Sequence, residues 1–311
     1  MNASPSAPSL FPVDVLPAVA QALAEGRPVV ALESTVLTHG LPHPVNYETA
    51  VEMERIVRAD GATPATIAVL DGRLTAGLAS AALERVCTDP GMKKLNRRDL
   101  AAAATLGWSG GTTVSATMAL AHAVGIRVFA TGGIGGVHRG ETGDASTDLE
   151  ELARTPVAVV CSGAKSILDL DRTLEWLETR AVPVAGWRTD NFPEFFSSAT
   201  SRPVSVRVDG ATEAARLISF QQSFGGGPLI CVACPADQAV PAGIVAQALE
   251  TAEAEASAAG ISGKDVTPFL LKRLTELTSG ATLRANLALL HNNAAVAAEI
   301  SVALSLQMAT R

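Results

Sequence analysis

The amino-acid sequence predicts an α/β fold, a three-layer α/β/α arrangement around a mainly parallel, mixed central sheet. Short apolar runs alternate with segments of helical spacing, which is the β-α-β rhythm of such folds. The runs are continuous rather than alternating in polarity, as expected for strands that are covered on both faces. They are Val29–Leu32, Thr66–Leu70, Val128–Thr131, Val157–Cys161, Val182–Gly186 and Leu229–Ala233.

The segments between these runs have the apolar spacing of helices. We expect helices at about residues 13–25, 46–59, 114–124, 148–153, 166–180 and 211–221, and a mostly helical end over residues 240–308. No Pro/Ser-rich linker divides the chain and no internal repeat is visible. We therefore expect residues 13–311 to form a single domain, preceded by a frayed tail over residues 1–12, which are rich in Ser, Pro and Ala.

Composition excludes several classes of protein. The 311 residues are 48% hydrophobic and 18% charged, which is typical of a globular chain with a large core. The net charge of −7 and the 4% aromatic content argue against a nucleic-acid partner. Four cysteines are too few for a disulfide scaffold, so we expect a cytoplasmic protein. The N-terminus has no secretory pattern, and we expect no membrane span.

Ligands of open parallel sheets bind beyond the carboxyl ends of the strands, so the residues that follow each strand are candidates. Lys165 follows a buried strand, and we expect it at the start of a helix. Partial desolvation there would lower its pKa and make it a nucleophile, whereas the alternative is a solvated lysine on a loop. Glu33 follows the first strand as a candidate general acid or base. Its alternatives are a helix cap or a partner for an arginine.

A candidate anion site is the segment Gly110–Ser115, which we expect to open a helix. Backbone N–H groups and hydroxyls at a helix start can bind a phosphate, although plain capping would use the same residues. Lys94, Arg97 and Arg98 precede this segment and can supply positive charge, unless they form a solvated basic patch.

A second polar segment carries Asp144, which is a candidate ligand for one hard metal ion that keeps water as its other ligands. Capping of a helix by Ser146 with Asp148 is the alternative for this segment. The glycine-rich stretch Gly132–Gly136 admits a ligand or forms a structural turn. It lacks the dinucleotide spacing, and the first strand is not followed by G-x-G-x-x-G, which counts against an oxidoreductase.

Other residues invite a structural interpretation. The segment Cys231–Cys234 begins inside an apolar run, so we expect its two cysteines to be structural thiols rather than a redox or zinc pair. His122 lies in an apolar helical run and is expected in the core. Asn286 and Asn293 lie within the last expected helix, although asparagine is a poor helix former. Each amide therefore needs a polar partner, which a crevice wall, another subunit or solvent can supply.

Taken together, several motifs resemble those of the pseudouridine-5′-phosphate glycosidase family, also called indigoidine synthase A-like proteins. The resemblance covers about residues 14–308, with the motifs in the family's order. They are Ala31–Val36, Thr38–Pro42, Lys94–Asp99, Gly111–Thr117, Phe129–His138, Cys161–Asp169, Ala285–Asn286 and Asn292–Ala294.

This resemblance implies reversible cleavage of the C–C glycosidic bond of pseudouridine 5′-phosphate to uracil and ribose 5-phosphate. It places the Schiff-base lysine at Lys165 and the general acid, or proton donor, at Glu33. It also implies an α/β/α core, a homotrimer and one manganese ion, mostly coordinated by water, on Asp144. The implied substrate-binding residues are Lys94, Thr113, Val114, His138, Ser146, Thr147, Asp148 and either Asn286 or Asn293.

One position departs from the family pattern, since Thr147 stands where an alanine is more usual. Two other functions remain open beside the glycosidase. One is a related glycosyl-phosphate enzyme of indigoidine-type pigment metabolism, and the other is a non-catalytic protein that binds sugar phosphates.

Overall fold

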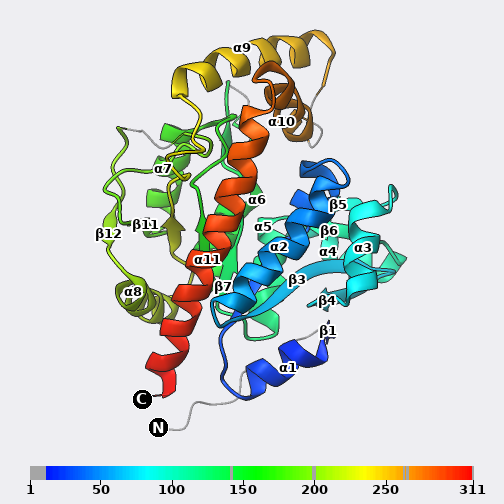
Figure 1. Ribbon diagram of the computed structural model, residues 1–311, viewed down its shortest axis with the longest axis vertical. Helices are drawn as coiled ribbons and strands as arrows, with labels where there is room; N and C mark the ends of the chain where they lie inside the picture. Colours follow the sequence, from blue (N-terminus) through cyan, green and yellow to red (C-terminus); the bar gives the residue numbers. More distant parts are fainter. Residues whose placement is uncertain (1–11, 141–142, 198–200, 262, 264–265, 310–311) are drawn as a thin grey trace.

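The computed structural model describes residues 12–140, 143–197, 201–261, 263 and 266–309, and these are built around one large sheet (Figure 1). The frayed tail expected over residues 1–12 lies, except for Pro12, outside the described residues. The strands are β1 Val13–Val15, β2 Val29–Leu32, β3 Thr63–Leu70, β4 Arg73–Ala76, β5 Lys93–Leu95, β6 Gly110–Thr112, β7 Val128–Ala130, β8 Val137–His138, β9 Ala158–Cys161, β10 Leu168–Asp169, β11 Val184–Trp187, β12 Val206–Val208 and β13 Leu229–Cys231.

The main sheet has the strand order β1-β4-β3-β2-β7-β9-β13-β11-β12, and β6 joins it beside β3 and pairs with β5. Within the described residues, β3 pairs antiparallel with β4 and β6, whereas the other pairs of this sheet are parallel. Strands β8 and β10 form a small antiparallel pair of their own. The predicted mixed, mainly parallel sheet is therefore confirmed.

Helices cover this sheet on both faces. They are α1 Pro17–Ala24, α2 Val45–Ala59, α3 Ser80–Thr88, α4 Leu100–Leu106, α5 Val114–Ala123, α6 Thr147–Arg154, α7 Leu170–Thr179, α8 Ala211–Phe224, α9 Ala242–Ala258, α10 Val266–Leu277 and α11 Ala281–Ala309. Helix α11 crosses the front of the sheet in Figure 1 and packs against α2, α8, β7 and β9, while α5 and α6 lie behind. The α/β fold class is confirmed.

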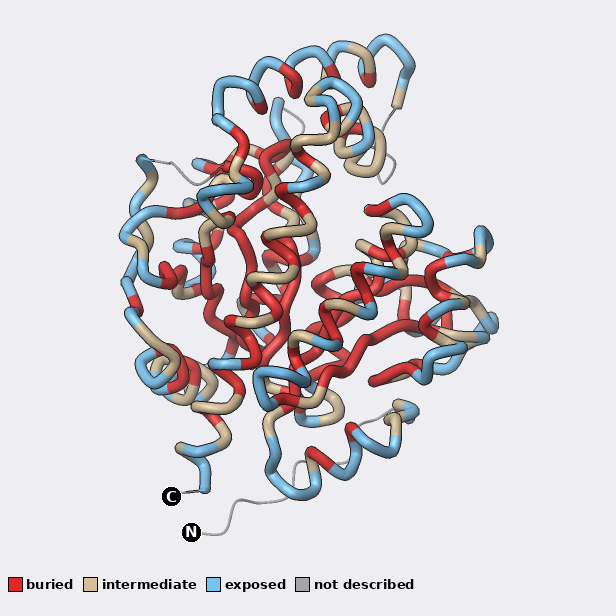
Figure 2. Tube along the Cα trace, in the orientation of Figure 1, coloured by how far each residue is buried: buried red, intermediate tan, exposed pale blue. Residues whose placement is uncertain are grey.

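The core is continuous through the middle of the sheet. Strands β2, β7, β9 and β13 are buried along their whole lengths, which Figure 2 shows as red tube between the helical layers. Small and β-branched side chains dominate these strands, so helices approach closely from both sides. This packing fixes the carboxyl ends of four neighbouring strands at one edge of the molecule.

Helix α11 is also the one helix of the described residues that is long and apolar enough to cross a membrane by length and composition. However, 56% of its most apolar window is buried against the rest of the protein. Its contacts with α2, α8 and the sheet are those of a core helix.

Three predictions of secondary structure are wrong. Residues 13–25 are not one helix, because Val13–Val15 pairs in parallel with β4 and the helix begins at Pro17. Residues 166–169 precede the helix expected there, because the Asp169 side chain caps α7 by accepting from Arg172 N at 3.1 Å. Gly110–Thr112 is strand β6, and α5 begins only at Val114.

Candidate active site

A cavity of about 820 Å³ opens beyond the carboxyl ends of β2, β7 and β9. Glu33 enters it directly after β2, the glycine-rich loop after β7, and Lys165 from the turn after β9. The cavity brings together most of the residues that the sequence proposed for catalysis, substrate and metal, but not Asn293, Arg97, Ser115 or Gly110–Thr112. The residues that it brings together include Glu33, Lys94, Thr113, Val114, His138, Asp144, Ser146, Thr147, Asp148, Lys165 and Asn286.

Glu33 is only 9% exposed, and its carboxylate accepts a hydrogen bond from Thr131 Oγ1. Burial raises the pKa of this carboxyl above its ordinary value, because the charged form is poorly solvated. The positive charge of Lys165 and the Thr131 hydrogen bond oppose that rise but do not cancel it. Burial therefore favours the protonated, proton-donating form of Glu33 relative to that of a surface glutamic acid.

Lys165 lies in a turn rather than at a helix start, so the local environment expected for it is wrong. Its backbone N–H donates to Ile134 O at 3.2 Å, and Leu168 N donates to its carbonyl at 3.0 Å. These two bonds fix the lysine beside the glycine-rich loop. Its half-buried side chain lines the cavity that Glu33 also lines.

The glycine-rich loop owes its glycines to close packing. A Cβ on Gly135 would overlap Ser146 Oγ, and one on Gly136 would overlap Thr173 Oγ1. A Cβ on Gly133 would meet the Phe195 ring. Gly132 and Gly133 line the cavity, so the loop is both a structural turn and part of the cavity wall.

Asp148 fastens this loop to the start of α5. Its Oδ1 accepts from Ser115 N at 3.0 Å, and its Oδ2 accepts from Gly135 N at 2.9 Å. Ser146 caps α6 by accepting from Asp148 N at 3.2 Å, so the predicted cap is present. Because Asp148 occupies the Ser115 N–H, the expected anion site on the α5 start retains Val114 N–H, the Thr113 hydroxyl and Lys94.

The glycines before α5 serve the sheet instead of an anion. A Cβ on Gly111 would overlap Thr38 Oγ1 and Ser34 O, and one on Gly110 would overlap Lys93 O. Of the arginines expected to add positive charge, Arg97 instead pairs with Glu151. Arg98 lines the cavity and lies 3.6 Å from Asp99.

Asp144 is a suitable single ligand for a hard metal ion. Its side chain is 61% exposed and faces the cavity, with His138 Nε2 4.0 Å from its Oδ2. The described residues contain no group of three or more metal-ligating side chains. The exposed Asp144 carboxylate alone could serve as the single protein ligand of a hard ion that keeps water as its other ligands.

The two candidate asparagines of α11 lie in different environments. Asn286 lines the cavity beside Gly132. Asn293 is fully buried, where its Nδ2 donates to Thr131 O at 2.9 Å and to Ser162 Oγ at 3.2 Å. Asn293 thus ties α11 to the ends of β7 and β9, whereas Asn286 is placed to meet a ligand.

Sequence reasoning missed part of the cavity wall. Val36–Gly40 forms a π-helical turn that brings Thr35, Val36 and His39 to the cavity, and α10 contributes Thr267 and Pro268. The motif containing His39 was visible, but nothing local indicates a π turn.

The cysteines are confirmed as buried free thiols. Burial raises the pKa of the Cys231 thiol, and so does its side-chain hydrogen bond with Cys161 across the β9–β13 pair. His122 is exposed, so its expected place in the core is wrong.

The chain matches the family model described as indigoidine synthase A like protein over residues 18–303. A pseudouridine-5′-phosphate glycosidase of Methylobacterium nodulans is 54% identical over 296 residues, which are 94% of this chain and 88% of that protein. One of the same name from Sorangium cellulosum is 53% identical, with 92% of each chain covered.

Two solved structures share the fold. A prealnumycin C-glycosynthase in complex with ribulose 5-phosphate is 41% identical with a TM-score of 0.89, over 96% of this chain and 99% of that one. An indigoidine synthase A-like protein of Thermotoga maritima is 37% identical with a TM-score of 0.86, over 94% and 97% of the two chains.

Replacing each of the two asparagines should impair a different property of the protein. Asn286→Ala should lower turnover and leave the melting temperature close to that of the wild type, because its side chain faces the cavity. Asn293→Ala should lower the free energy of unfolding by about 1–3 kcal/mol, because it leaves buried polar groups unpaired. Thermal unfolding and turnover of both variants check this, and a stable Asn293→Ala protein would contradict it.

Glu33→Gln should abolish turnover but stabilise the fold at neutral pH. Since folding raises the pKa of Glu33 above 4.5, the native state binds more protons than the unfolded state between these two values. Stability of the wild type therefore falls as the pH rises through that window, and the neutral variant escapes the loss. Melting temperatures from pH 4 to pH 8 measure the difference. A variant that melts below the wild type at pH 8 would contradict the argument.

Proposed function

Because the chain belongs to the indigoidine synthase A-like family, we propose that it is a pseudouridine-5′-phosphate glycosidase. In this reversible reaction, pseudouridine 5′-phosphate reacts with water to give uracil and ribose 5-phosphate. The observation that carries the proposal is the convergence of Glu33 and Lys165 on one cavity, from the ends of separate strands. Relatives about half identical over nearly the whole chain bear this name.

A C–C glycosidic bond is hard to break because its leaving atom has no lone pair to protonate. In the proposed mechanism, the Lys165 amine attacks C1′ of the ribose and the ring oxygen leaves with a proton from Glu33. The lysine nitrogen, now carrying an extra proton, returns it to the Glu33 carboxylate. It then forms a protonated imine with C1′ as the C–C bond breaks, and the uracil carbon takes its proton from Glu33. Water hydrolyses the imine, which releases ribose 5-phosphate and restores the amine.

The buried Glu33 suits the acid step. Its raised pKa favours the protonated form that an acid needs, and the neighbouring Lys165 charge favours the carboxylate once the proton has been given. Turnover that depends on protonated Glu33 falls as the pH rises through the raised pKa.

The substrate phosphate is assigned to Lys94, Thr113, the Val114 N–H and the hydroxyls of Ser146 and Thr147. All of these line the cavity on the side of β5, α5 and α6. Anchoring a phosphate there allows binding energy from a non-reacting group to position C1′. His138 and Asn286 are assigned to the rest of the substrate.

A manganese ion is assigned to Asp144, where it would help to neutralise the charge of the bound phosphate. The exposed carboxylate fits an ion with a large water shell. The homotrimer and the cytoplasmic location rest on the family resemblance and on the free cysteines, and sedimentation of the purified protein tests the former.

A second candidate is C–C bond formation with another aglycone. It is favoured by the likeness to a prealnumycin C-glycosynthase that binds ribulose 5-phosphate. Product analysis with pseudouridine 5′-phosphate, and with ribose 5-phosphate plus uracil, separates the two. A non-catalytic binding protein would release no uracil at all.

Incubation with pseudouridine 5′-phosphate and manganese should release uracil, and Lys165→Ala should lose this activity. Borohydride reduction in the presence of ribose 5-phosphate should attach the sugar to Lys165, because the reduction traps the imine. Mass analysis of the peptides identifies the labelled lysine. Label on another lysine, or full activity of Lys165→Ala, would overturn the mechanism.

Unphosphorylated pseudouridine should be a poor substrate, because donors arranged for a phosphate stay unpaired. Two or three such losses of about 1–3 kcal/mol each give a preference on the order of 10²-fold or more. Lys94→Ala should reduce this preference by roughly 10- to 100-fold, which is the value of a charged hydrogen bond. The ratio of kcat/KM for nucleotide and nucleoside measures it in both proteins. A wild-type ratio near one would refute the assignment.

A further inference from the structure

We propose that Glu151 is a positioning residue for the phosphate side of the cavity, and that it acts through Arg97. The proposal rests on the proposed function, because it assumes that the phosphate binds between β5 and α6. Glu151 lies outside the residues that line the cavity, and the proposed mechanism does not use it.

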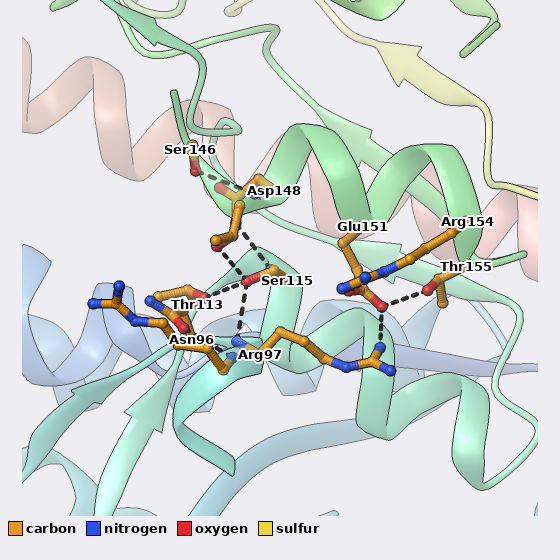
Figure 3. Close-up of polar contacts among 11 residues, drawn as sticks. Asn96, Arg97, Thr113, Ser115, Ser146, Asp148, Glu151, Arg154 and Thr155 are labelled. Atoms are coloured by element: carbon orange, nitrogen blue, oxygen red, sulfur yellow. Dashed lines mark hydrogen bonds and ion pairs between the residues drawn. The ribbon is translucent and has the colours of Figure 1, made fainter. Parts of the chain in front are cut away.

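Glu151 is a fully buried carboxylate surrounded by donors (Figure 3). Arg97 Nη1 forms an ion pair with its Oε1, and the Thr155 hydroxyl donates to the same oxygen. Arg154 Nη2 donates to Oε2 at 2.7 Å. Complete burial of an ionised carboxylate is costly, and it is tolerated here because two guanidinium groups and a hydroxyl replace the lost water.

The pair joins two elements of the cavity wall. Glu151 lies on α6 three residues after Asp148 and four after Thr147, so the three share one face of the helix. Arg97 lies three residues after Lys94 and two residues after β5 ends at Leu95. The ion pair therefore links the segment that carries the phosphate lysine to the helix whose first turn carries the hydroxyls.

Backbone pairing does not make this link. Strand β5 pairs with β6 in the described structure. Other ties among the described residues run through Ser115, whose Oγ accepts from Arg97 N at 3.4 Å and lies 3.0 Å from Thr147 Oγ1. These two contacts are neutral and the first is long, whereas the Ser115 N–H also donates to the Asp148 carboxylate at 3.0 Å. The Arg97–Glu151 ion pair, in which Glu151 is fully buried and the Arg97 side chain is 41% exposed, is thus a direct charged restraint on the width of the phosphate pocket.

The arrangement predicts a specific defect when the charge is removed. Glu151→Gln keeps the size of the side chain but breaks the ion pair, so β5 and the start of α6 lose their restraint. The Kd for ribose 5-phosphate, measured by calorimetry, should rise on the order of tenfold. KM for pseudouridine 5′-phosphate should rise similarly with little change in kcat, and kcat/KM for the nucleoside should stay close to that of the wild type.

Glu150→Gln is the matched control. Glu150 is the preceding residue of α6, and its partly exposed carboxylate pairs with Arg180 at 2.6 Å. This variant should keep wild-type values for all of these quantities. Arg97→Gln should reproduce the defect, and Arg97→Lys should restore most of the affinity. The Arg97 variants also keep the test valid if Glu151→Gln does not fold.

Two results would overturn the inference. One is an unchanged Kd for ribose 5-phosphate in folded Glu151→Gln and Arg97→Gln proteins. The other is an equal loss of kcat/KM for nucleotide and nucleoside, which indicates a general structural role. A wild-type protein that binds ribose 5-phosphate but releases no uracil contradicts the proposed function and leaves this binding test intact.

Discussion

The Asp148 carboxylate holds together two pieces of backbone that come from distant parts of the chain. Its oxygens accept from Ser115 N at the start of α5 and from Gly135 N in the loop after β7. A carboxylate that accepts two backbone N–H groups is well satisfied, so it can be buried in this position. Without it, the glycine-rich loop and the start of α5 would each need another partner. This one side chain therefore ties the start of α5 to the glycine-rich loop in the cavity wall, beside the bond of 3.0 Å from Ser146 N to Gly136 O.

The negative charge of Asp148 also acts on the chemistry, because it contributes to the raised pKa of Glu33. Burial is the larger cause, and the positive charges of Lys165 and Lys94 work against both. The balance leaves Glu33 favouring its protonated form while a cation stands close by. A carboxyl whose pKa is raised holds its proton for donation, which is what the role of acid requires. The fold brings Glu33 and Lys165 together by ending β2 and β9 at the same edge of the sheet.

The sequence predicted the family, the fold class and the central strands, because continuous apolar runs and ordered motifs are local signals. It placed Glu33 and Lys165 by their positions after strands, and both line the cavity. It missed β1 and misassigned Gly110–Thr112, because those strands are defined by partners far away in the chain. His122 was expected in the core because its neighbours are apolar, yet only the packing of α5 decides which of its faces is exposed. The link between Arg97 and Glu151 spans 54 residues and has no local signature.

The cavity has two kinds of wall, which helps to explain how relatives with different names share one fold. The ends of the strands carry Glu33 and Lys165, and the deep packing of the sheet holds them rigidly. The π turn and α10 contribute His39, Thr267 and Pro268, and α10 packs mainly against α9, with further contacts to that turn and to α11. Chemistry at a sugar carbon needs the rigid wall, because small displacements of a nucleophile cost much rate. The helical wall is built from segments outside the sheet, so it is the part of the cavity that can vary among relatives without displacing Glu33 and Lys165.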